Sequence, residues 1–312
     1  MKNYAVVFPG QGSQFVGMLS DFEQSSIVKE TFEQASDALG YGLWALTQQG
    51  PEEELNPTHR TQPALLTSSV AIWRLWQSQT DIQPSQLAGH SLGEYSALVC
   101  AGVFDLDDGV KLVEKRGELM QKAVPEGVGS MAAIIGLDDE KIETACLEAA
   151  QGQIVSPVNY NSPGQVVIAG NQEAVGRASE LCKEFGAKRA MPLAVSVPSH
   201  CALMKPAADE FAQFLAAVNM RSPVIDVVNN VDVAIETTPE AIQHSLLKQL
   251  YSPVQWTASV QSMIDTGVSQ FFEMGPGKVL TGLSKRINKS VPCANIGNES
   301  TLNDALAWLK NE

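Results

Sequence analysis

Hydrophobic positions along the chain recur with two periods, and together they predict strands that alternate with helices. Residues 4–8 form a short apolar run typical of a buried strand, whereas apolar residues three and four apart predict a helix over residues 27–39. An acidic stretch at residues 51–54 predicts a short solvated helix start, and Gln62-Pro63 opens a largely apolar helix that continues to Trp76. This alternation is typical of an α/β protein.

A predicted helix over residues 106–123 carries one charged residue on its apolar face. Asp105 is placed to cap this helix, and Arg116 lies three or four residues from several members of the apolar stripe. Burying an unpaired arginine costs several kcal/mol or more, so Arg116 requires an anion. Two partners are open: a structural pair with a buried Asp or Glu, or a bound carboxylate, which the planar guanidinium can hold through two hydrogen bonds.

Residues 131–197 alternate in shorter units. We expect strands over 131–136, 154–159, 165–169 and 189–197, and helices over 139–150 and 172–185. The order strand-helix-strand-strand-helix-strand is that of a ferredoxin-like unit. The pattern therefore predicts a small subdomain inserted into a larger one.

The C-terminal part resumes the α/β pattern. We expect a strand over 224–231, helices over 239–250 and 254–266, a strand over 270–274, and a helix that begins at Lys278. This last segment contains the basic residues Lys285, Arg286 and Lys289, and a smaller group is formed by Lys183, Lys188 and Arg189. Each group is either a solvated face or a landing area for an acidic partner.

Composition narrows the functional classes. The chain of 312 residues has a formal net charge of −14, which argues against nonspecific binding to nucleic acid or anionic membranes. No apolar run approaches the roughly 18 residues of a membrane span, and the N-terminal strand lacks a signal peptide's cleavage region. The five cysteines are odd in number and widely spaced, so we interpret them as reduced core residues, not as disulfides or a metal site. We expect a cytoplasmic protein of about two domains.

The strongest candidate for chemistry is the pentapeptide Gly89-His90-Ser91-Leu92-Gly93, which matches the G-x-S-x-G pattern of a nucleophile elbow. In such a turn a serine stands in strained backbone between a strand and a helix, and the glycines let neighbouring backbone pass. Residues 92–99 have the spacing of that helix, whose first N–H groups would face an oxyanion. The alternative is a glycine-bounded turn with an idle serine.

A serine nucleophile requires a base, and the chain has four histidines. His200 follows a turn fixed by Pro198 where the chain returns to the larger domain, so it is the best candidate base. His90 lies inside the elbow and should point away from Ser91, while His59 and His244 lie in polar helix-end surroundings. The alternative for His200 is a structural role, and adjacent Cys201 is discounted because neighbouring side chains usually project differently.

These features together resemble one enzyme family over nearly the whole chain, in order. The motifs are Gly10-Gln11-Gly12-Ser13-Gln14, the elbow through Glu94, Arg116, Pro198-Ser199-His200 and Gly275-Pro276-Gly277. They resemble the acyltransferases of fatty-acid and polyketide synthesis, and within these the bacterial malonyl-CoA:acyl carrier protein transacylases. The resemblance implies transfer of a malonyl group from malonyl-CoA to the pantetheine thiol of acyl carrier protein through a malonyl-serine.

Roles of individual residues follow from the same resemblance. It implies that Ser91 is the nucleophile and His200 the base, and that the main-chain carbonyl of Gln249 orients the histidine in place of a triad acid. The backbone N–H groups of Gln11 and Leu92 match the family's oxyanion hole.

Further matches concern substrate, fold and partners. Arg116 matches the arginine that binds the malonyl carboxylate, and His90 occupies the family's variable position beside the nucleophile. The implied fold is an α/β-hydrolase-like core formed by residues 1–126 and 200–312, with a ferredoxin-like insert at 127–199. Carrier protein is acidic, so we expect Lys285, Arg286 and Lys289 to contribute to its docking. We expect a monomer with no permanently bound cofactor and no metal, and with a coenzyme A thioester as substrate.

Two other functions remain open on the sequence. A serine thioesterase or hydrolase would use the same elbow and base, although no motif nominates the Asp or Glu of a triad, and Arg116 would then lack a purpose. A non-catalytic acyl-binding module would tolerate the loss of Ser91 or His200, yet both are present. A hydrolase and a transacylase differ in whether water or a thiol resolves the acyl-serine.

Overall fold

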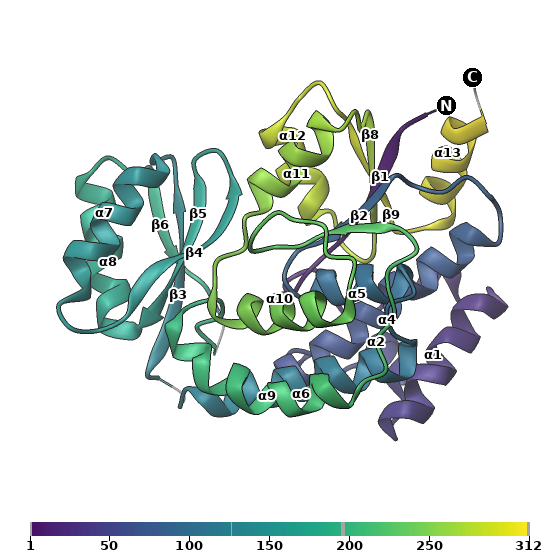
Figure 1. Ribbon diagram of the computed structural model, residues 1–312, viewed down its shortest axis with the longest axis horizontal. Coiled ribbons are helices and arrows are strands. Elements are labelled where there is room, and N and C mark those ends of the chain that lie inside the picture. The colour runs from purple at the N-terminus through teal and green to yellow at the C-terminus, as the bar shows by residue number, and fades with distance from the viewer. Residues whose placement is uncertain (1, 126, 195–196, 311–312) are drawn as a thin grey trace.

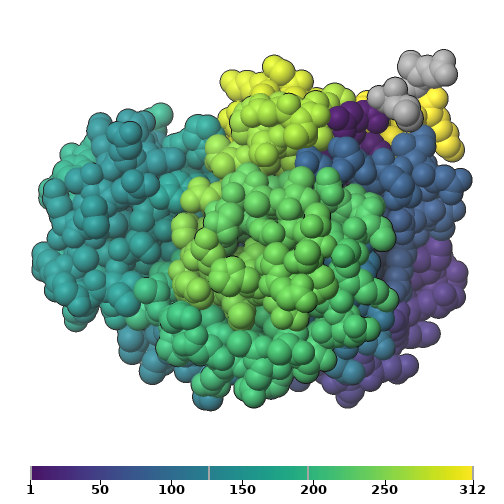
Figure 2. All heavy atoms as spheres, in the orientation of Figure 1, coloured from purple at the N-terminus to yellow at the C-terminus, as the bar shows by residue number. Residues whose placement is uncertain are grey.

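The computed structural model describes residues 2–125, 127–194 and 197–310. Two sheets, each with its own helices, lie side by side (Figure 1), and the expected order of strands and helices is largely found. The two units are in direct contact, since the Tyr160 N–H donates to the Val254 carbonyl at 3.0 Å and the Val254 N–H donates to Val158 at 2.9 Å. Figure 2 shows the smaller unit, in teal, against green and yellow-green segments of the larger one.

The larger sheet has five parallel strands in the order β7-β2-β1-β8-β9. These are β1 (Tyr4–Phe8), β2 (Gln86–Gly89), β7 (Asp226–Val228), β8 (Gln270–Met274) and β9 (Cys293–Ile296). Every residue of β1 is buried, as expected for a central parallel strand covered on both faces. Phe8 pairs with Gly89, so the loops that follow β1 and β2 leave the sheet at the same edge.

Helices cover both faces of this sheet. Alternate β1 side chains enter two separate cores, with Tyr4, Val6 and Phe8 in the larger one. The helices are α1 (Ser26–Leu39), α2 (Leu43–Gln49), α3 (Glu52–Leu55), α4 (Thr58–Gln77), α5 (Leu92–Cys100), α6 (Leu106–Ala123), α9 (Lys205–Ala217), α10 (Pro239–Tyr251), α11 (Trp256–Asp265), α12 (Val279–Ile287) and α13 (Glu299–Lys310). Within the described residues, no helix is both long and apolar enough to cross a membrane.

The smaller sheet is antiparallel, in the order β4-β5-β3-β6. It consists of β3 (Gly129–Ile135), β4 (Val155–Ser162), β5 (Gln165–Asn171) and β6 (Arg189–Pro192), with α7 (Asp139–Ala150) and α8 (Gln172–Glu184) on one face. The other face packs on Cys201 and Leu203 of the larger unit. Residues 200–204 therefore lie at the junction of the two units.

Three expected strand and helix limits are wrong. The strand expected over 189–197 ends at Pro192, although the Leu193 N–H still donates to Met131 of β3 at 3.0 Å; residues 195–196 lie outside the described part. The strand expected over 224–231 ends at Val228, because Asn229 Oδ1 accepts from the N–H groups of Val231 and Asp232 and turns the chain. The helix expected from 254 begins at Trp256, because Val254 pairs with β4.

One helix start and one helix cap also differ from expectation. Helix α4 begins at Thr58 and contains Pro63 in its interior, so the hydrogen bond lost at proline is outweighed by burial of nearly the whole helix. Helix α6 begins where expected, but Asp105 makes no side-chain cap; its carboxylate instead binds Arg221 at 2.5 Å.

Candidate active site

Ser91 stands between β2 and α5 in a backbone conformation that few residues adopt, with φ 52° and ψ −106°. Its flanking glycines have no room for a side chain. A Cβ on Gly89 would lie 1.9 Å from the Gly93 carbonyl, and a Cβ on Gly93 would lie 2.1 Å from the Phe8 carbonyl oxygen. The two glycines are therefore a steric requirement of the elbow, and Ser91 stands at its tip.

His200 lies against Ser91, with Nε2 2.7 Å from the serine Oγ. Its Nδ1 lies 2.7 Å from the main-chain oxygen of Gln249, which can only accept, so Nδ1 carries the proton and Nε2 offers a lone pair to Oγ. His200 is 3% exposed, and burial together with the nearby charge of Arg116 lowers its pKa to about 3. The imidazole is therefore a neutral base at pH 7.

Arg116 is fully buried on α6 and reaches the same hydroxyl. Its Nη2 lies 3.2 Å from Ser91 Oγ and 2.9 Å from Gln249 Oε1, and Nη1 donates to Gln62 Oε1 at 2.8 Å. Among the described residues no carboxylate forms an ion pair with this guanidinium, and its Nε has no acceptor. Of the two partners left open by the sequence, the direct pair with a buried acid is absent from the described part of the chain.

Three residues to which the sequence analysis gave no role in the site complete the surroundings: Gln62, Glu94 and Asn230. Glu94 is 2% exposed and accepts hydrogen bonds from Gln249 Nε2 and from the Asn230 N–H, both at 2.9 Å. Burial raises the pKa of its carboxyl to about 7, against the opposing effect of those two donors and of Arg116. The sequence did contain a signal for Glu94: like Arg116, it is a charged residue in a largely apolar helical segment.

Gln11 and Leu92 have backbone N–H groups beside the nucleophile loop. Leu92 is the first residue of α5, and the Gln11 loop lies against the elbow, where a Cβ on Gly10 would be 2.5 Å from the His90 carbonyl oxygen. Gln11 is further held through its side chain, which accepts from Thr58 Oγ1 at 3.0 Å. Neither backbone N–H binds an acceptor within the part of the chain that the structure describes.

Comparison with known proteins identifies the family that uses this arrangement. The family model described as the acyl transferase domain matches residues 5–302. The chain belongs to the acyl transferase family. The malonyl CoA-acyl carrier protein transacylase of Escherichia coli K12 is 63% identical over 307 residues, covering 98% of this chain and 99% of the relative. That of Bacillus subtilis is 44% identical over 314 residues, covering 100% and 99%.

Solved structures of acyltransferases agree with these relatives. An acyl carrier protein S-malonyltransferase from Vibrio cholerae superimposes with a TM-score of 0.96 at 62% identity, covering 97% of this chain and all of that one. A malonyl-transacylase in complex with a type II polyketide synthase acyl-carrier protein superimposes with a TM-score of 0.97 at 61% identity, covering 98% and 99%. The resemblance to acyltransferases of fatty-acid and polyketide synthesis is confirmed.

The remaining histidines of this acyltransferase lie away from the Ser91 hydroxyl. His90 turns to the smaller unit, where its Nε2 lies 2.7 Å from Asn161 Oδ1, and its ring centroid is 5.6 Å from that of Trp256. Burial lowers the pKa of His90, so it too is neutral. His59 is half-buried and His244 is exposed.

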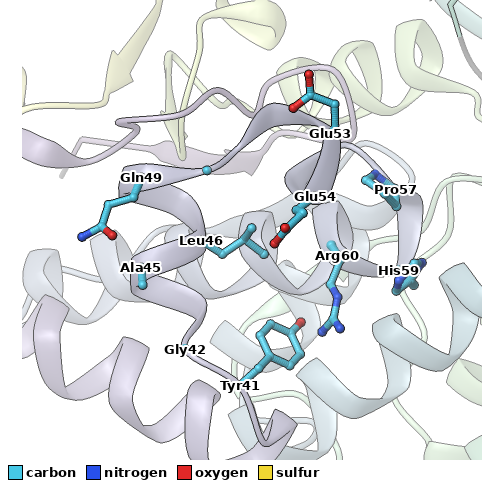
Figure 3. Close-up of a pocket in the computed structure, with 11 residues that line it drawn as sticks. Tyr41, Gly42, Ala45, Leu46, Gln49, Glu53, Glu54, Pro57, His59 and Arg60 are labelled. Carbon is cyan, nitrogen blue, oxygen red and sulfur yellow. The ribbon is translucent and has the colours of Figure 1, made fainter.

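A cavity of about 550 Å³ lies elsewhere in the acyltransferase, between α2, α3 and the start of α4 (Figure 3). In it the Arg60 guanidinium stands 3.8 Å from the centre of the Tyr41 ring. Thr58, which lies between the lining residues Pro57 and His59, contacts Gln11 of the active site. The cavity is lined by Tyr41, Gly42, Ala45, Leu46, Gln49, Gly50, Glu53, Glu54, Pro57, His59 and Arg60, so it does not include the nucleophile.

Proposed function

We propose that the chain transfers a malonyl group from malonyl-CoA to the pantetheine thiol of acyl carrier protein, through an ester on Ser91. The transacylases named above, 63% and 44% identical over nearly the whole chain, support this reaction. One observation supports the roles of the residues: His200 Nε2 at 2.7 Å and Arg116 Nη2 at 3.2 Å meet at the same Ser91 Oγ. A base and a carboxylate-binding group thus converge on one nucleophile.

In the first half-reaction, Ser91 Oγ attacks the malonyl thioester carbonyl while His200 takes the serine proton at Nε2. The tetrahedral oxyanion is held by the N–H groups of Gln11 and Leu92, and losing one such donor typically costs about 3 kcal/mol. The C–S bond then breaks, and His200 returns its proton to the coenzyme A thiolate. The imidazolium that forms transiently is stabilised by the Gln249 carbonyl on Nδ1.

In the second half-reaction, His200 takes the proton of the pantetheine thiol, whose sulfur attacks the malonyl-serine carbonyl. The same oxyanion hole holds the second intermediate, and the proton passes to Ser91 Oγ as the ester bond breaks. Substrate and product are both thioesters, so the free energy stored in the acyl bond is retained. Coenzyme A leaves before carrier protein reacts, which makes the transfer a ping-pong reaction.

Selectivity for malonyl follows from the charge of Arg116. Neutral amides surround the guanidinium, so a malonyl carboxylate would supply the anion that the protein itself does not place in contact with it. An acetyl group has no carboxylate, so it leaves the buried guanidinium of Arg116 without an anion. A bound carboxylate would also offset the positive charge that helps to lower the pKa of His200, making the base stronger when the correct substrate is present.

We propose a docking area for carrier protein where the two basic groups meet. Arg189 and Gln165 both pair with Ile135 across the smaller sheet, so their side chains share one face, and Arg286 of α12 contacts Gln165. The exposed residues Lys285 and Lys289 lie near Arg286 on and after α12. Reversing all three charges from 285 to 289 should weaken the salt dependence of transfer to carrier protein; an unchanged salt dependence would contradict this docking area.

The finer fold and cellular assignments are also proposals. The smaller unit, with strand order β4-β5-β3-β6 and two helices on one face, supports a ferredoxin-like insert at 127–199 in an α/β-hydrolase-like core of 1–126 and 200–312. All five cysteines are free thiols, in keeping with a reducing cytoplasm. We propose a monomer without a resident cofactor; a dimer in sedimentation at micromolar concentration would contradict the monomer.

The deciding experiment is the intact mass of the protein after brief mixing with malonyl-CoA. We expect a malonyl adduct on the wild type, no adduct on Ser91→Ala, and discharge of the adduct by carrier protein to malonyl-carrier protein. Steady release of free malonate without a carrier-dependent product would instead indicate a thioesterase. No adduct and no turnover would leave an acyl-binding module.

A further inference from the structure

Asn230 lies in the turn after β7 and is fully buried. All four of its polar groups form hydrogen bonds with the nucleophile elbow or with residues that support it. Its Oδ1 accepts from the Ser91 N–H and its Nδ2 donates to the Gly89 carbonyl, both at 2.7 Å. Its backbone N–H donates to Glu94 at 2.9 Å, and its carbonyl accepts from the Gln255 N–H at 2.8 Å. One side chain thus ties the two ends of the turn that presents Ser91.

Glu94 extends these contacts to the other residues of the site. The same oxygen, Oε2, accepts from Asn230 and from Gln249 Nε2, and Gln249 Nε2 also donates to the Ser91 carbonyl at 3.0 Å. Gln249 Oε1 then accepts from Arg116 Nη2 at 2.9 Å. A buried carboxylate therefore fixes the rotamer of the glutamine that lies between it and the guanidinium.

The backbone at Ser91 needs this support. A non-glycine residue at φ 52° and ψ −106° is strained and persists only where its surroundings hold it. Both backbone groups of Ser91 are held, the N–H by Asn230 and the carbonyl by Gln249 and by the Glu94 N–H at 3.1 Å. Rotation of either peptide would move Oγ away from His200.

We propose that Asn230 and Glu94 are positioning residues of acyl transfer: Asn230 holds Ser91 in its strained conformation, and Glu94 holds Gln249 against Arg116. This inference rests on the proposed function for its acyl-transfer readout. We expect a different defect when each residue is lost. Loss of Asn230 misplaces the nucleophile for every electrophile, whereas loss of the Glu94 charge also disturbs the guanidinium that selects malonyl.

The test compares Asn230→Ala and Glu94→Gln with matched controls at the other end of the same sheet. Asn295 is a buried asparagine whose Nδ2 donates to the carbonyls of Glu273 and Gly275 at 3.3 and 3.2 Å. Glu273 is a fully buried glutamate that accepts from N–H groups at the start of α12. Asn295→Ala and Glu273→Gln therefore remove equivalent buried hydrogen bonds away from Ser91.

Four quantities are measured for each variant: the midpoint of thermal unfolding, the rate of acylation by malonyl-CoA and acetyl-CoA, the KM for malonyl-CoA, and the rate of sulfonylation by phenylmethanesulfonyl fluoride. In the last reaction Ser91 Oγ displaces fluoride from sulfur and His200 takes the proton, so the nucleophile is tested without any coenzyme A substrate. For Asn230→Ala we expect all three labelling rates to fall together, by about 10- to 100-fold, with KM for malonyl-CoA little changed.

For Glu94→Gln we expect, in addition, a smaller ratio of malonyl to acetyl acylation. The proposal is overturned if Ser91 is labelled as fast in both variants as in control variants whose thermal unfolding midpoint falls by the same amount. Should Asn230→Ala fail to fold, Glu94→Gln decides alone, because its side chain keeps the volume of the original. A wild type that is sulfonylated at Ser91 but forms no malonyl adduct refutes the proposed function and leaves the positioning test intact.

Discussion

Replacing Arg116 with alanine should abolish the preference for malonyl over acetyl while leaving a working nucleophile. The guanidinium is fully buried and already donates to two neutral amides and the Ser91 hydroxyl, while its Nε has no hydrogen-bond partner among the described residues. A hydrogen bond to a charged group contributes about 1.5–3 kcal/mol, so a carboxylate held through two of them gains at least about 3 kcal/mol. At about 1.4 kcal/mol per factor of ten, the malonyl rate should fall by at least about 10²-fold.

Acetyl acylation should not fall in the same way. Removing the guanidinium removes one of the two main causes that lower the pKa of His200, so the base becomes stronger, not weaker. The assay is rapid mixing with each thioester separately, followed by the intact mass of the acyl-protein and the ratio of the two rate constants.

A matched control is Arg74→Ala. Arg74 lies in α4 and donates to Thr31 and Gln34, so its loss perturbs the fold without touching Ser91. We expect the malonyl-to-acetyl ratio of this control to equal that of the wild type. If Arg116→Ala retains the wild-type ratio while Ser91 is still acylated, the guanidinium does not select the substrate, and the argument from its unmet charge is wrong.

Three further predictions concern the base, the elbow and the neighbouring thiol. Because the pKa of His200 is lowered to about 3, the imidazole stays neutral down to low pH; in Glu94→Gln, which lacks the carboxyl that titrates at about pH 7, acetyl acylation should stay flat between about pH 7 and 5, and an acid limb near pH 6.5 in this variant would refute the reasoning. Gly93→Ala places a Cβ 2.1 Å from the Phe8 carbonyl oxygen and should lower the free energy of unfolding by about 3 kcal/mol. Gly282→Ala, where no atom lies within 4 Å of the added Cβ, should not lower it, and equal denaturant midpoints for the two variants would contradict this steric argument. The Cys201 thiol bonds Pro198 at 3.1 Å, so Cys201→Ala should acylate at the wild-type rate, and loss of the adduct would implicate the thiol.

Local sequence determined the parts of the protein that depend on neighbours along the chain. The β1 strand was predictable from an apolar run, α6 from its stripe, and the elbow from glycines that sterics require on either side of Ser91. The anomalous charge of Arg116 on that stripe was visible in the sequence because an amphipathic period makes any exception stand out. The family followed from the order of such motifs, and the family match confirms it.

Tertiary structure decided everything that joins distant segments. The strand β9 and the limits of β7 and α11 depend on pairing partners, which a local period does not contain. The elbow and His200 are 109 residues apart in sequence, and only the fold of the larger unit, in which His200 binds the main chain of Gln249 and Leu250 in α10, brings their side chains to 2.7 Å. Glu94 lies within the elbow motif and Asn230 outside every motif, but the sequence indicated a role for neither, because each satisfies buried backbone and amide groups from distant segments. Such partners are specified by the geometry of the folded chain, since a buried polar group accepts whichever complementary atom the fold brings within reach.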